Sequence, residues 1–107
     1  MTLDKSTAEY RFLATTAINA ALMALDRREL RDDLAWRIRA LLYAARDEAG
    51  RGEWTDAREN AMRAADLAPS DSDVRGAAYA AAQVLGARTL DEARQSFRAA
   101  IAMVLSP

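Results

Sequence analysis

Apolar residues recur every three or four positions along most of this chain, which is the spacing that places them on one face of an α-helix. The first such stretch runs from about residue 6 to residue 25, with apolar positions at Tyr10, Leu13, Ala14, Ala17, Ile18, Ala21, Leu22 and Leu25. No stretch alternates apolar and polar residues with a period of two, so no strand is expected. The pattern predicts an all-α fold of about five antiparallel helices.

Groups of cap-forming residues predict where these helices begin. They are the capping boxes Ser6–Glu9, Asp26–Glu29 and Thr89–Glu92, together with the run of N-cap formers at residues 70–73. The box at Asp26 would start the second helix directly after the first, in a tight corner. Gly50 and Gly86 are expected to end the second and fourth helices as left-handed caps. Pro69 is expected to end the third helix, because proline cannot donate the next helical hydrogen bond.

From Ile38 onward the sequence repeats itself. Ile38 aligns with Val74, an offset of 74 − 38 = 36 residues, and a period between 20 and 50 residues is typical of stacked repeats. The identical pairs are Arg39/Arg75, Tyr43/Tyr79, Ala44-Ala45/Ala80-Ala81, Gly50/Gly86, Ala57-Arg58/Ala93-Arg94 and Ala64/Ala100. We therefore divide a single helical domain, residues 1–107, into a tail (1–5), an N-terminal helix with the start of the second helix (6–37), a first repeat (38–73) and a second repeat (74–107).

The two repeats resemble the tetratricopeptide repeat (TPR) family, from about residue 38 to the C-terminus. The matching residues are Ala45 and Ala81 in the first helix of each unit, Gly52 in the turn, Trp54 and Leu90 opening the second helix, the alanine pairs Ala57/Ala64 and Ala93/Ala100, and Phe97. The period is two residues longer than the 34 of the family. Further departures are Ala44 and Ala80 in place of leucine, Glu48 and Val84 in place of tyrosine, and Ala61 in place of an aromatic residue. An alanine-rich helical bundle with chance self-similarity is the alternative.

The resemblance implies a concave groove that is lined by the first helix of each repeat and holds a peptide or a helix. By periodicity its lining would be Arg39, Leu42, Arg46, Ala49, Arg75, Ala78, Ala82 and Leu85. We take Arg39, Leu42, Tyr43, Arg46, Arg75 and Tyr79 as the candidate partner-binding residues. Three arginines on one surface would suit carboxylates, whereas the alternative is a solvated face of locally paired charges. The N-terminal helix either caps the repeats by packing on the second and third helices, or lies in the groove as an internal ligand, which would remove the arginine face.

Composition narrows the classes of function. The chain has 51% hydrophobic and 29% charged residues and a net charge of −1, which fits a soluble domain without a field for nucleic acid or membrane. The arginines between residues 27 and 39 are interleaved with carboxylates, for example in the i,i+4 pairs Arg28–Asp32 and Asp33–Arg37. With no cysteine and no histidine, the usual general base and metal ligands are missing. Adjacent carboxylates such as Asp47 and Glu48 diverge by about 100° on a helix, so neither a metal nor a cofactor is expected.

These features predict a non-catalytic protein–protein interaction module: a small TPR-like adaptor, chaperone or accessory subunit that binds a partner peptide or helix, for which the arginines suit an acidic one. The alternative is a small helical antitoxin, immunity protein or phage-type inhibitor that acts by binding one target enzyme. Alanine buries little area, so we expect further burial in a homodimer or a hetero-complex. The N-terminal sequence lacks the features of a signal peptide, and the expected location is the cytoplasm. Trp36, Trp54, Tyr43 and Tyr79 are expected in the core or the groove wall, and an exposed aromatic among them would be the best interface anchor.

Overall fold

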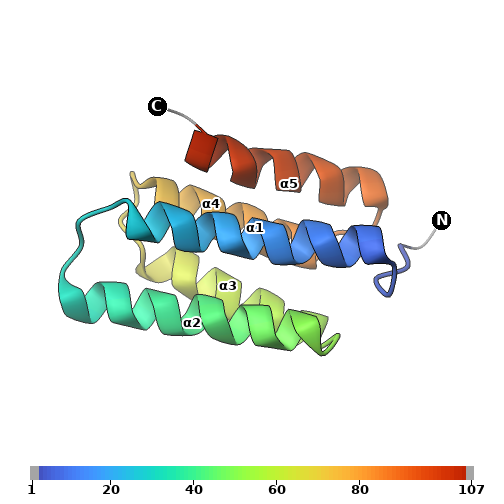
Figure 1. The fold of residues 1–107 in the computed structure, drawn as a ribbon, viewed down its shortest axis with the longest axis horizontal. Coiled ribbons are helices and arrows are strands. Elements are labelled where there is room, and N and C mark those ends of the chain that lie inside the picture. The colour runs from blue at the N-terminus through green and yellow to red at the C-terminus, as the bar shows by residue number, and fades with distance from the viewer. Residues whose placement is uncertain (1–2, 106–107) are drawn as a thin grey trace.

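The computed structural model describes residues 3–105 and consists of five helices, each running opposite to the one before it (Figure 1). Their bounds are α1 Ala8–Asp26, α2 Asp32–Gly50, α3 Trp54–Leu67, α4 Asp73–Leu85 and α5 Leu90–Leu105. Helices α2, α1 and α5 form one layer, with α1 in the middle, and α3 and α4 lie behind them. The predicted all-α fold of five helices is confirmed, and the described residues contain no strand. Residues 1–2 of the predicted tail and 106–107 of the second repeat lie outside the described part of the chain.

Helices α4 and α1 form the centre of the packing, because each contacts three others: α4 contacts α1, α3 and α5, and α1 contacts α2, α4 and α5. Ten of the nineteen residues of α1 are buried, among them the fully buried Tyr10 and Ile18, so its apolar surface is wide enough for three neighbours. The expectation that this helix packs on the second and third helices is right for α2, whereas α1 touches α3 mainly at its start, where Tyr10 meets Trp54. The other main neighbours of α1 are α4 and α5, since α3 is covered from its two sides by α2 and α4.

The core is built mainly from alanine, as the periodicity of the third helix predicted. The buried residues of α3 are Ala57, Ala61, Ala64 and Ala65, and α4 buries five alanines of its own. Tyr10 is the largest of the fully buried side chains. Its hydroxyl donates a 2.7 Å hydrogen bond to the carbonyl oxygen of Val84, and its ring meets Trp54 edge-on at 5.1 Å. Tyr10 therefore fastens α1 to the end of α4 and to the start of α3.

The start of α1 is one residue later than predicted. Thr7 is the N-cap, and its hydroxyl accepts the backbone N–H of Tyr10 at 3.2 Å. Ser6 instead donates both its N–H and its hydroxyl to the carboxylate of Asp4. The carboxylate of Glu9 accepts from the guanidinium of Arg94 on α5, at 2.9 Å from Nε. Both members of the predicted capping box therefore have other partners.

The tight corner predicted after Leu25 is wrong, because α1 continues through Asp26 and residues 27–31 connect it to α2. Asp26 does not cap α2: its carboxylate accepts a 2.8 Å hydrogen bond from Arg39, two turns into that helix. The two predicted i,i+4 pairs are also not among the ion pairs of the described residues. The guanidinium of Arg28 lies 3.8 Å from the carboxylate of Asp71, which is in the α3–α4 turn. The guanidinium of Arg31 lies 3.6 Å from the carboxylate of Asp33.

The other helix ends follow the predicted residues more closely. Ser72 caps α4 by accepting the N–H of Arg75, and Thr89 accepts the N–H of Glu92 at the start of α5. Helix α2 ends at Gly50 as expected, but the left-handed residue of the turn is Gly52, with φ 76°. Gly86, with φ −98°, follows the end of α4 without a left-handed conformation, so both glycine caps differ from the prediction.

Candidate functional site

The groove predicted between the first helices of the two repeats is occupied by α1. Helix α1 packs against both α2 and α4, the helices that would line the groove. The apolar residues assigned to that lining are buried: Leu42, Ala49, Ala78, Ala82 and Leu85. Leu42 is fully buried and belongs to the core, so it is not available to a partner in this structure. The N-terminal helix therefore covers the residues of α2 and α4 that the sequence assigned to a partner-binding groove.

Two of the predicted arginines hold α1 in this position. Arg39 donates to Asp26, and Arg46 donates a 3.0 Å hydrogen bond from Nη1 to Asn19 Oδ1. The guanidinium of Arg46 also lies 4.8 Å from the ring centroid of Tyr43. Arg39, Tyr43 and Arg46 are therefore together on the edge where α2 borders α1, and their polar contacts are made within the chain.

Arg75 and Tyr79 lie in a different place, on the outward side of α4. They line a groove of about 550 Å³ with Asp66 of α3 and Met103 of α5. The 36-residue offset places Arg75 in register with Arg39, but the two arginines do not share one surface. Helix α1 lies between α2 and α4 and covers the surface that would connect these two helices. The six candidate residues are thus divided between the core, the α1–α2 edge and this second groove.

The most exposed aromatic side chain of the described residues is Trp36, with 68% of its surface accessible. It stands on the outward side of α2, beside an open groove of about 510 Å³ between α2 and α3, which we call the Trp36 groove. The lining residues are Trp36, Arg37, Ala40, Leu41, Arg63, Asp66 and Leu67. Leu41 and Leu67 are half-buried and pack on the core, so they form a fixed apolar floor.

The residues beside this floor are charged. Arg37, Arg63 and Asp66 are all exposed, and none of them takes part in an ion pair within residues 3–105. Their formal charges sum to +1, so the rim offers two guanidinium groups against one carboxylate. Ala40 is exposed and small, which lets a ligand approach the backbone of α2 closely.

The sequence contained a signal for this groove. The buried positions of α2 are Ile38, Leu42, Ala45 and Ala49. At about 100° per residue, Trp36 lies two positions and about 200° away from Ile38, on the opposite side of the helix. Trp36 is therefore not a core residue, and the groove that it lines is not the predicted one, whereas Trp54 is half-buried against Tyr10 as expected.

Groups that could perform chemistry are few in the described part of the chain. No cluster of three or more carboxylate, histidine or cysteine side chains among residues 3–105 is arranged to hold a metal ion. Burial raises the pKa of Tyr10, whose neutral hydroxyl has a structural role in the bond to Val84. Desolvation lowers the pKa of Lys5, whose ammonium donates to the carbonyl oxygen of Leu85 at the end of α4. Within the same residues, no helix is long and apolar enough to cross a bilayer.

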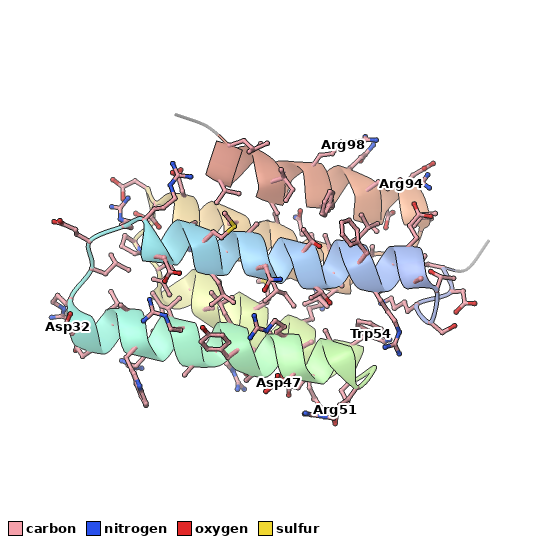
Figure 2. All side chains as sticks on the ribbon, in the orientation of Figure 1. Asp32, Asp47, Arg51, Trp54, Arg94 and Arg98 are labelled. Atoms are coloured by element: carbon pink, nitrogen blue, oxygen red, sulfur yellow. The ribbon has the colours of Figure 1, made fainter. Side chains whose placement is uncertain are left out.

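Several other charged residues lie on the outer sides of α5 and α2. Figure 2 shows Arg94 and Arg98 on the outer side of α5, and Asp47 and Arg51 near the end of α2. Arg51 pairs with Glu53 at 2.7 Å, which raises the pKa of this arginine through hydrogen bonding and charge. Both side chains are well exposed, so the pair orders the α2–α3 turn without forming a site.

No protein-family model matches the chain, and no curated protein or solved structure is detectably similar to it.

Proposed function

We propose that this chain is a non-catalytic protein–protein interaction module, which binds a peptide or helix of a partner in the Trp36 groove. The observation that carries this proposal is the exposure of Trp36 beside an apolar floor. Tryptophan and arginine are the residue types most enriched among those that dominate binding energy. Leaving a tryptophan in water is unfavourable in the free protein, and covering it recovers that cost on binding.

The shape of the Trp36 groove favours a helical ligand. Helices α2 and α3 run antiparallel, and a groove between two packed helices is the position a third helix takes elsewhere in this fold, as α1 does against α4 and α5. The lining positions follow helical rows, with Trp36 and Ala40 on one, and Arg37 and Leu41 on the next. A partner helix would place an apolar residue over Ala40 and between Trp36 and Leu67.

The rim of the groove favours a ligand with acidic residues. Arg37 and Arg63 can each donate two parallel hydrogen bonds to a carboxylate. Because both are exposed, these contacts would contribute more to the association rate and to selectivity than to affinity. An acidic partner is therefore still proposed, as the sequence suggested, but Arg37 and Arg63 would bind it in place of the arginines first expected to do so.

The 36-residue repeat supports the same class of function. The pairs α2–α3 and α4–α5 are antiparallel helix–turn–helix units, as a TPR-like adaptor, chaperone or accessory subunit of the cytoplasm would require. In this proposal α1 completes the fold by filling the inner groove, and the partner binds on the outer side of α2 and α3.

Affinity capture from a native lysate with three forms of the protein tests this function. The forms are the wild type, Trp36→Ala, and Tyr79→Ala as a matched control, since Tyr79 is also an exposed aromatic residue but lines the other groove. A partner that is retained by the wild type and by Tyr79→Ala, and lost by Trp36→Ala, would support the proposal. Retention of the same partner by Trp36→Ala at wild-type affinity, measured with both proteins purified, would refute it.

A further inference from the structure

The outward face of α1 carries a row of four residues that reads similarly in both directions. Phe12, Thr16, Asn19 and Met23 are spaced by four, three and four positions, which keeps them within one narrow stripe of the helix. The two outer members are apolar and exposed, Phe12 by 61% and Met23 by 56%. The two inner members are smaller, polar and half-buried. We call this row the α1 stripe.

The α1 stripe lies in the middle of the broadest face of the molecule. Helix α1 is flanked by α2 and α5 in one layer (Figure 1), and this face measures 43 by 27 Å. On the α5 side, the ring of Phe97 lies 6.1 Å from that of Phe12. A standard interface covers about 800 Å² on each partner, roughly two-thirds of such a rectangle. The face is therefore large enough for a stable dimer.

We propose that a second copy of this chain covers this face, with the two α1 helices antiparallel across a two-fold axis. An axis midway between residues 17 and 18 places Phe12 against Met23 of the other copy, and Thr16 against Asn19. A thioether on an aromatic ring is a favourable contact, and the central hydroxyl and amide groups can share a hydrogen bond. Each α1 stripe thus finds a matching surface in a copy of itself, as an isologous interface requires.

Charge complementarity sets the antiparallel direction. Glu9 and Arg27 lie at opposite ends of α1, both on its α5 side: Glu9 bonds to Arg94, and Arg27 donates to the carbonyl oxygen of Val104. The two-fold axis brings Glu9 of each copy close to Arg27 of the other, and it places opposite ends of the two helix dipoles together. This inference stands apart from the Trp36 groove, which lies on the outer side of α2 and α3.

Sedimentation velocity across a range of micromolar concentrations tests the dimer. The wild type is expected to form dimers, and Met23→Glu and Phe12→Glu are each expected to raise the dissociation constant more than about tenfold, because a carboxylate would be buried without a partner. Trp36→Glu is the matched control, with the same new charge at a similarly exposed position, and it should dimerise like the wild type. Circular dichroism establishes whether each variant is folded. If only one of the two α1 variants is folded, that variant alone is enough for the test.

Two results would overturn the proposal: a wild type that stays monomeric at the highest concentration, or a dimer that is weakened by Trp36→Glu and not by the folded α1 variants. The direction of the helices has its own test, since the chain has no cysteine. Under oxidising conditions, a mixture of Phe12→Cys and Met23→Cys proteins should give a disulfide-linked mixed dimer. A disulfide between two Phe12→Cys chains would contradict the antiparallel arrangement.

Discussion

Replacing Tyr10 by phenylalanine should destabilise the fold by a modest and calculable amount. The substitution removes one buried hydrogen bond, from the hydroxyl to the carbonyl oxygen of Val84, and keeps the ring against Trp54. The carbonyl is not left without a donor, because it also accepts the N–H of Ala87 at 3.2 Å. The cost is therefore that of a single net hydrogen bond, about 1 kcal/mol, or a melting temperature lower by about 4–8 °C for a domain of this size.

The same substitution should change how stability depends on pH. Burial raises the pKa of Tyr10 in the folded state above its ordinary value of 10.0. The folded state therefore favours the neutral hydroxyl, and its contribution is complete below pH 10 and is lost as the pH rises above that value. Near pH 11, about one unit above the ordinary pKa, titration of Tyr10 should have lowered the free energy of unfolding of the wild type by up to about 1.4 kcal/mol. The phenylalanine variant has no hydroxyl at this position and should not show this loss. The advantage of tyrosine at neutral pH should then be gone.

Urea unfolding followed by circular dichroism measures both effects. Wild type and Tyr10→Phe are compared at pH 7 and near pH 11, and an unchanged denaturant slope would show that the surface exposed on unfolding is the same. Comparing the two proteins at each pH cancels the titration of Lys5, which lies above the Tyr10 ring. Equal stability at pH 7, together with an equal loss of stability at high pH, would refute the placement of the Tyr10 hydroxyl.

Three further substitutions test local features by the free energy of unfolding. Gly50→Ala should stabilise the protein by up to about 1 kcal/mol, since Gly50 ends α2 and a methyl group there meets nothing within 4 Å. Gly52→Ala should destabilise it by about 1–2 kcal/mol because of the positive φ at this position. A Gly52→Ala protein that is more stable than Gly50→Ala would contradict the backbone conformation of this turn. Arg39→Ala should cost less than about 1 kcal/mol, with a smaller loss at high salt, because its ion pair with Asp26 is partly exposed; a larger, salt-independent loss would contradict this role.

The fold could be predicted from the sequence where local chemistry decides. Ser72 and Thr89 cap their helices because no stronger partner competes for their hydroxyls as N-cap acceptors. Asp26 and Glu9 look equally good as capping residues in the sequence. Each is instead paired with an arginine of another helix, Arg39 and Arg94, which becomes a neighbour only after folding. A capping box is a local signal, and tertiary ion pairs override it.

The candidate site was harder to predict than the fold. Periodicity places Arg39 and Arg75 at equivalent positions of two repeats, but it does not determine what lies between the repeats. The burial of Tyr10, Ile18 and their neighbours in α1 requires three surrounding helices, and this requirement brings α1 between α2 and α4. The exposure of Trp36, in contrast, followed from its angle to Ile38 and could have been predicted.

The affinity for a purified partner shows whether the exposed tryptophan of α2 is the anchor of a protein-binding groove. Isothermal titration of the captured partner into wild type, Trp36→Ala and Tyr79→Ala would compare two exposed aromatic residues on different surfaces. We expect Trp36→Ala to weaken binding by at least about 2 kcal/mol, as for an anchor residue, and Tyr79→Ala to bind like the wild type. Equal affinity for wild type and Trp36→Ala would contradict this role of Trp36.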